Sequence, residues 1–185
     1  MAHGFVENFV PEGLAKALEE TLLSSDFPWY WRPSSKYGTN QGSEQSNDFQ
    51  FVHIIYYNDQ PQSEVFMLVQ DLVSFFGIAT GIKIKNIHKI KANLLTKQDI
   101  DNQSLEETIH ADIEHPDKKY ISVVYYVNDS DGNTVGFDKD KNVAFDVTPK
   151  RASSVYFPSE MQHRATPPKV SKRRVVLNMV FEIDG

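Results

Sequence analysis

His110 and Asp112 have the residue types and the spacing that metal-dependent chemistry requires. They lie two positions apart in residues 108–112, for which the sequence predicts a β-strand. Because side chains alternate along a strand, both would leave the same face. A neutral imidazole and a carboxylate on one face suit a divalent metal ion. His115 and Asp117 repeat the spacing, but the proline between them breaks the alternation, and we interpret that pair as a solvated turn.

A second histidine and an arginine extend this hypothesis. His163 follows a predicted strand at 153–157, and Arg174 begins a predicted strand at 174–183. Two histidines and one carboxylate on one face of an octahedral metal leave three adjacent positions free, as in non-haem Fe(II) oxygenases. Those positions would take a chelating 2-oxo acid and O₂. A guanidinium group matches the remote carboxylate of such an acid with two parallel hydrogen bonds.

The last predicted strand has one apolar face and one mixed face. The apolar face consists of Val175, Leu177, Met179, Phe181 and Ile183, and the mixed face consists of Arg174, Val176, Asn178, Val180 and Glu182. We expect the apolar face to pack under helices. An arginine and an asparagine that project into a β-core need partners, so the mixed face indicates an internal polar pocket.

The elements that must position these residues form a double-sheet β-core with helices on one face. Many short predicted strands with turn signals between them are typical of a jelly roll, also called a double-stranded β-helix. An aromatic cluster at 27–31 lies within a long polar loop at 24–48, and it would form a substrate lid or a hydrophobic plug. The sequence predicts helices at 11–23 and 63–76, the second ending at Gly77, and strands at 49–57, 82–97, 108–112, 120–128, 134–137, 143–147, 153–157 and 174–183.

Length and composition predict a single domain over residues 1–185, with helical support and a loop at 1–80 and a jelly-roll core at 81–185. The absence of cysteine excludes disulfides, thiolate metal sites and a cysteine nucleophile. The formal charge, 19 − 25 = −6, argues against a nucleic-acid scaffold. No secretory signal and no membrane-spanning run is evident, so we expect a cytoplasmic protein without a membrane partner.

The segment from His110 to Phe181 resembles the core of Fe(II)/2-oxoglutarate-dependent dioxygenases and is most similar to their prolyl-4-hydroxylase-like branch. The pattern of the family often has two glycines where this chain has Gly132-Asn133. Asparagine tolerates a left-handed backbone, so the turn can keep its shape. The matching motifs are His110-Ala-Asp112, the strand end at 125–128, the turn at 131–134, the run 158–168 around His163, and the strand at 174–181.

The resemblance implies a role for each matching residue. Arg173 and Arg174 both have the spacing of the basic residue of the family, and strand parity favours Arg174. Asn93 would line the pocket on the strand before the metal motif. In this scheme His110, Asp112 and His163 ligate Fe(II), Arg174 pairs with the distal carboxylate of 2-oxoglutarate, and the hydroxyl of Tyr126 bonds the same carboxylate.

The resulting hypothesis is a hydroxylase of peptidyl-proline, an amino acid or another small molecule, which releases succinate and CO₂. Its cofactors would be Fe(II), the cosubstrate 2-oxoglutarate and O₂, with ascorbate as a further candidate. Its partner would be a small-molecule or peptide substrate. Two other classes stay open: a non-catalytic jelly-roll binding module, and a cupin-type metalloenzyme that does not use 2-oxoglutarate.

Overall fold

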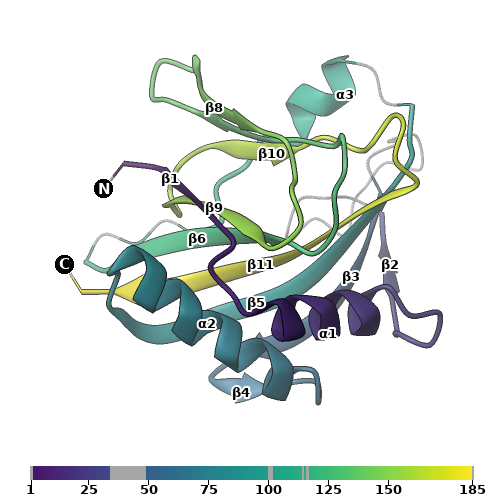
Figure 1. Cartoon of the computed structure of the whole chain (residues 1–185). Coiled ribbons are helices and arrows are strands. Elements are labelled where there is room, and N and C mark those ends of the chain that lie inside the picture. The colour runs from purple at the N-terminus through teal and green to yellow at the C-terminus, as the bar shows by residue number, and fades with distance from the viewer. Residues whose placement is uncertain (1, 34–48, 100–101, 114, 116, 185) are drawn as a thin grey trace.

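Two antiparallel sheets face each other in this computed structural model, which describes residues 2–33, 49–99, 102–113, 115 and 117–184 (Figure 1). The strand order is β1-β9-β6-β11-β5-β3-β2 in the major sheet, with β4 on β3, and β10-β7-β8 in the minor sheet. This is the predicted jelly roll. The strands are β1 (Gly4–Glu7), β2 (Tyr30–Arg32), β3 (Gln50–Tyr57), β4 (Gln60–Pro61), β5 (Ile84–Thr96), β6 (Lys119–Tyr126), β7 (Thr134–Phe137), β8 (Val143–Val147), β9 (Ser153–Pro158), β10 (His163–Ala165) and β11 (Arg173–Ile183).

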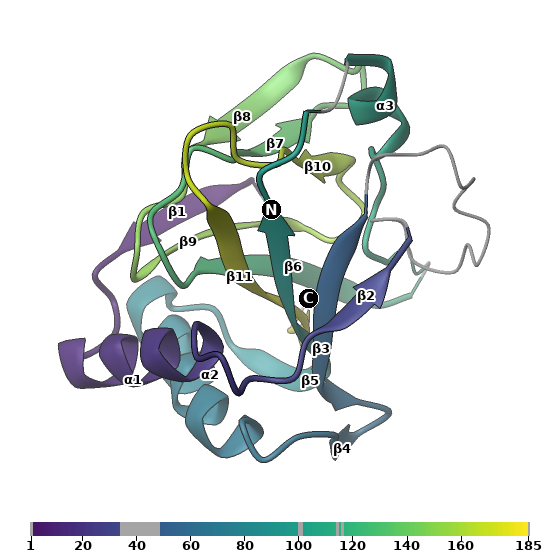
Figure 2. The same cartoon turned by 90° about the vertical axis from the view of Figure 1, so that its right-hand side faces the viewer.

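Two helices cover the face of the major sheet that points away from the minor sheet (Figures 1 and 2). They are α1 (Glu12–Leu22) and α2 (Phe66–Thr80). The buried faces of both helices pack with the apolar face of β11 in one core, which confirms the parity inferred from the sequence. The core residues from α1, α2 and β11 are Ala15, Leu18, Leu22, Val69, Leu72, Val73, Phe76, Val175, Leu177, Met179, Phe181 and Ile183.

The second helix ends four residues later than the sequence predicted. Gly77 lies inside α2, and the helix continues to Thr80. Gly81 ends it instead, in a left-handed conformation with φ of 70°, and its amide donates to the carbonyl of Gly77. A left-handed residue after the last helical turn is a common helix end, and glycine adopts it without steric cost.

The strand predicted at residues 108–112 is wrong. A short helix, α3 (Asn102–Glu107), precedes this segment, and His110 forms only an isolated bridge with His163. A ladder needs successive backbone pairs, whereas this segment bonds across only to His163 and Ser159. The other predicted strands agree with the structure to within two residues at each end, while the short elements β1, β2, β4, β10 and α3 were not predicted.

The aromatic cluster at 27–31 divides between core and surface. Phe27 is buried and Trp29 packs against the same core, whereas Tyr30 and Trp31 on the edge strand β2 are about 60% exposed. Residues 34–48 of the predicted loop lie outside the described residues, so its role as a lid or plug stays a prediction. Among the helices of the described ranges, none is both long and apolar enough to cross a membrane.

Candidate functional site

His110, Asp112 and His163 meet between the two sheets. One ligand atom of each lies within 4.8 Å of the others. The bridge between the two histidines sets this geometry, because the amide of His110 donates to the carbonyl of His163 at 3.0 Å and the amide of His163 returns the bond at 2.9 Å. The amide of Asp112 donates to the carbonyl of Ser159 at 3.0 Å. Backbone bonds thus hold His110 and Asp112, which lie outside any regular strand, next to His163 at the start of β10.

The hydrogen bonds of the two imidazoles fix their tautomers. Nδ1 of His110 lies 2.8 Å from the carbonyl oxygen of Thr108, and Nδ1 of His163 lies 3.0 Å from that of Met161. A carbonyl oxygen only accepts, so each Nδ1 carries the proton and each Nε2 keeps its lone pair. This arrangement is typical of metal-binding histidines. Nε2 of His163 lies 3.7 Å from Oδ2 of Asp112.

The environment keeps His110 and Asp112 in the protonation states that metal binding requires. Burial, followed by repulsion from His163, lowers the pKa of His110 to about 4, so its imidazole is neutral at pH 7. Burial alone would raise the pKa of Asp112. The nearby imidazole of His163, the charges of Lys89 and Lys91 and a 2.6 Å hydrogen bond from Ser122 outweigh that burial and hold the pKa of Asp112 well below its usual range. Neutral imidazoles and an ionised carboxylate fit Fe(II) as ligands.

The alternative pair, His115 and Asp117, lies apart from this cluster. Both residues are exposed, and the amide of Asp117 donates to Nδ1 of His115 at 3.1 Å. That contact closes a local turn at the surface, as the sequence indicated.

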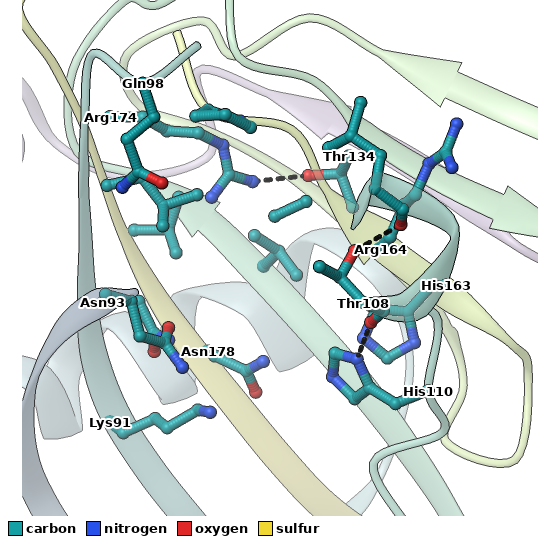
Figure 3. A pocket seen from close by; sticks show the side chains of 17 residues that line it. Lys91, Asn93, Gln98, Thr108, His110, Thr134, His163, Arg164, Arg174 and Asn178 are labelled. Carbon is teal, nitrogen blue, oxygen red and sulfur yellow. Dashed lines mark hydrogen bonds between the residues drawn. The ribbon is translucent and has the colours of Figure 1, made fainter. Parts of the chain in front are cut away.

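Arg174 places a buried guanidinium group in the same pocket. Its side chain projects from β11 and the residue is 2% exposed, whereas its neighbour Arg173 is exposed. Nε of Arg174 donates to the carbonyl of Gly132 at 2.8 Å, and a terminal nitrogen donates to Oγ1 of Thr134 at 2.7 Å (Figure 3). Burial lowers the pKa of Arg174, but no shift of plausible size neutralises a guanidinium at pH 7.

Thr134 is a site residue that the sequence did not single out. Its Oγ1 accepts both from Arg174 and from the Tyr126 hydroxyl, the latter at 2.9 Å. With both lone pairs engaged, the hydroxyl proton of Thr134 is available to a ligand. Tyr126 is fully buried and its ring lies under the guanidinium, with 5.9 Å from ring centroid to Cζ of Arg174. A threonine at the start of a short hairpin strand carries no sequence signal for such a role.

The turn before Thr134 differs from the expectation. Asn133 is not among the described residues with positive φ, so it does not use the left-handed conformation. Its side chain instead donates to Asp146 at 2.6 Å, and its amide donates to Thr166 at 2.7 Å. Gly132 is required for close approach: a Cβ there would lie 2.5 Å from the carbonyl oxygen of Thr166 and 3.0 Å from Cδ of Arg174.

The remaining polar residues of the pocket lie on β5 and β11. Asn93 lines the pocket as predicted, and its Nδ2 donates to Oε1 of Gln50 at 2.5 Å. Lys91 and Asn178 lie in the wall next to it and were not assigned to the site from the sequence. Burial and the nearby charge of Lys89 lower the pKa of Lys91 to about 8.

Comparison with known proteins shows what the second half of the chain resembles. Residues 100–182 match the family described as the 2OG-Fe(II) oxygenase superfamily. The matched part, which contains His110, Asp112, His163 and Arg174, is similar to that superfamily. The ligand set of His110, Asp112 and His163 fits the Fe(II) that the description of the family names. No curated protein sequence matches this chain.

Solved structures extend the likeness in fold over the whole chain. A Pseudomonas putida prolyl-4-hydroxylase superposes with a TM-score of 0.62 at 17% identity, covering 100% of this chain and 94% of the other. A Burkholderia pseudomallei oxidoreductase of the 2OG-Fe(II) oxygenase family superposes with a TM-score of 0.67 at 15% identity, covering 98% of this chain and 85% of the other. A third structure is a Trichoplax adhaerens prolyl hydroxylase in complex with a peptide fragment of the hypoxia inducible factor oxygen degradation domain. It superposes with a TM-score of 0.61 at 14% identity, covering 99% of this chain and 84% of the other. The N-terminal helices and β1–β4 therefore share the fold as well.

The close approach of Gly132 to Thr166 generates a prediction about the stability of this protein. Gly132→Ala forces a methyl group against a backbone oxygen, and we expect the free energy of unfolding to fall by about 1–3 kcal/mol, the usual cost of overpacking. Gly13→Ala in α1 is the matched control, because its Cβ would meet nothing within 4 Å. Urea denaturation measures both, and an equal effect of the two substitutions would show that the turn can move away.

Proposed function

We propose that the protein is an Fe(II)- and 2-oxoglutarate-dependent hydroxylase. One observation carries the proposal: a single pocket is lined by His110 and His163 and, farther along, by the buried guanidinium of Arg174. The ligand atom of Asp112 lies within 4.8 Å of those of the two histidines. A dicarboxylate whose 2-oxo acid end chelates the metal would place its other carboxylate at Arg174. Neither the triad alone nor a buried arginine alone would require that ligand.

The roles of the metal-binding residues follow from their hydrogen bonds. His110 and His163 present Nε2 and Asp112 presents a carboxylate oxygen, while Thr108, Met161 and Ser122 keep these groups in place. Bound Fe(II) with 2-oxoglutarate and O₂ supplies the oxidation chemistry, which would yield succinate, CO₂ and a hydroxylated product. The protein would contribute three ligands to the metal and a pocket that contains the buried guanidinium of Arg174.

Arg174, Thr134 and Tyr126 would bind the distal carboxylate. The guanidinium supplies charge, and the hydroxyl of Thr134 supplies a neutral donor. Tyr126 orients that hydroxyl through its own bond to Thr134. Because the pocket wall is buried here, the ion pair acts with little screening by solvent. Asn93 would contact ligands from the opposite wall.

The substrate, the domain organisation and the location of the protein are part of the proposal. The prolyl hydroxylase neighbours, one of them with a bound peptide fragment, support a peptide or small-molecule substrate. Packing of both helices on the major sheet supports a single domain over 1–185. We propose a cytoplasmic location. The inward position of Arg174 weighs against a cupin-type enzyme that lacks 2-oxoglutarate.

The first prediction concerns the metal. His110→Ala and His163→Ala should each lose tight Fe(II) binding, because two remaining ligands do not complete the face that the ion requires. Wild-type protein should hold one Fe(II) per chain after anaerobic loading and desalting. His115→Ala, at an exposed position, is the matched control and should keep full stoichiometry. Retention of iron in both triad variants would disprove the assignment.

The second prediction concerns the cosubstrate. Arg174→Ala should raise the half-saturating 2-oxoglutarate concentration about 30- to 1000-fold, because a charge-assisted contact inside a pocket contributes roughly 2–4 kcal/mol. Arg174→Lys should recover part of the loss, since it keeps the charge without the planar fork. Iron stoichiometry should not change.

Arg173→Ala controls for the effect of charge near the pocket, because Arg173 is the exposed neighbour. Turnover of 2-oxoglutarate to succinate is the readout for all three variants. A defect in Arg173→Ala together with an unchanged Arg174→Ala would contradict the assignment of Arg174 to the distal carboxylate of 2-oxoglutarate.

A further inference from the structure

Three polar side chains form a cradle in the wall of the pocket: Lys91, Asn93 and Asn178. The register of β5 and β11 pairs Lys91 with Asn178 and Asn93 with Val176. Both strands therefore present these side chains on the face that also carries Arg174. Lys91 and Asn93 lie across the pocket from His110 and His163, and Asn178 lies between the two groups (Figure 3).

The cradle has buried acceptors without partners. Asn178 is 8% exposed, and its Oδ1 is completely buried with no hydrogen-bond partner in the described structure. Oδ1 of Asn93 is in the same state, although its Nδ2 is satisfied by Gln50. An unsatisfied buried acceptor lowers stability, so two of them in the wall of one pocket indicate a ligand that donates hydrogen bonds.

The cradle is separate from the groups that would hold the cosubstrate. Arg174 reaches Gly132 and Thr134 on the side of the minor sheet, and Tyr126 lies on β6. Lys91 and Asn93 project from β5, on the other side of β11 from β6. A 2-oxoglutarate molecule that spans the triad and Arg174 would therefore leave the β5 side of the pocket to a second ligand.

We propose that Lys91, Asn93 and Asn178 bind the substrate, and that the substrate is a small zwitterion, of which a free α-amino acid is the simplest case. Its carboxylate would accept from Nζ of Lys91, and its ammonium group would donate to Oδ1 of Asn93 and of Asn178. A peptidyl-proline ring would offer these acceptors no donor, and sites built to form hydrogen bonds discriminate strongly against ligands that lack them. This inference rests on the proposed function, because it assigns the substrate class of the same pocket.

The test measures binding and turnover separately. Free L-amino acids, their N-acetyl and carboxamide derivatives, and a blocked proline-containing peptide are titrated calorimetrically into anaerobic protein loaded with Fe(II) and 2-oxoglutarate. The same compounds are then scored in air for succinate formed above the substrate-free rate. We expect at least one free amino acid to bind and to stimulate turnover, and either blocked derivative to bind at least about tenfold more weakly.

Variants locate that binding in the cradle. Lys91→Met and Asn178→Ala should each raise the dissociation constant of the active amino acid about 10- to 100-fold. In Asn178→Ala, which leaves the charges around Asp112 unaltered, the half-saturating 2-oxoglutarate concentration of substrate-free turnover should not rise. Lys85→Met on the same strand is the matched control, because Lys85 is largely exposed and pairs with Glu182, away from the residues that line the pocket.

Two outcomes would overturn the inference. The first is that no free amino acid binds, or that only the blocked peptide stimulates turnover. The other is a rise in the half-saturating 2-oxoglutarate concentration in Lys91→Met and Asn178→Ala, which would assign the cradle to the cosubstrate. Failure of the proposed function looks different: no succinate would form with or without any added compound.

Discussion

The central position of β11 in the major sheet determines where each group of the site can lie. It pairs with β5 on one side and β6 on the other, so its side chains alternate between the helix-side core and the pocket. A one-residue slip would exchange the two faces and expose five apolar side chains to the pocket. Burial of Val175, Leu177 and Met179 against the helices therefore also fixes Arg174 and Asn178 inside.

The minor sheet supplies the other half of the site through a few backbone bonds. The bridge between His110 and His163 ties an irregular segment to β10, and β10 pairs with β7, which carries Thr134. The amides of residues 169–171 donate to the carboxylate of Asp131 and secure the loop that leads into β11. These contacts connect the triad to Arg174, so a shift of β10 or β7 would move one end of the pocket relative to the other.

Charge in the pocket is arranged around one buried carboxylate. Asp112 keeps its negative charge because Lys89 and Lys91 lie near it on β5 and Ser122 donates to it from β6. A divalent ion and Arg174 would carry three positive charges, and Asp112 and a dicarboxylate would carry three negative ones, so these four groups would balance. Lys91 then gives the β5 side of the pocket a basic character, which agrees with a substrate that carries a carboxylate.

The parts of this structure that could be predicted from the sequence depend on strand periodicity. Alternation alone distinguished Arg174 from Arg173 and identified Asn178 as inward-facing. The positions that could not be predicted depend on contacts between distant segments. His110 and Asp112 are held by a bridge rather than a ladder, Thr134 gains its role from two residues on other strands, and α2 passes Gly77 because the left-handed residue is Gly81.

The claim that one pocket holds both the metal and 2-oxoglutarate is tested most directly by an optical titration. Fe(II)-loaded protein is titrated anaerobically with 2-oxoglutarate while visible absorption is recorded. Chelation of the iron by the 2-oxo acid should produce a weak metal-to-ligand charge-transfer band that saturates at one 2-oxoglutarate per chain. An iron-loaded protein that develops no band at any 2-oxoglutarate concentration would contradict the account.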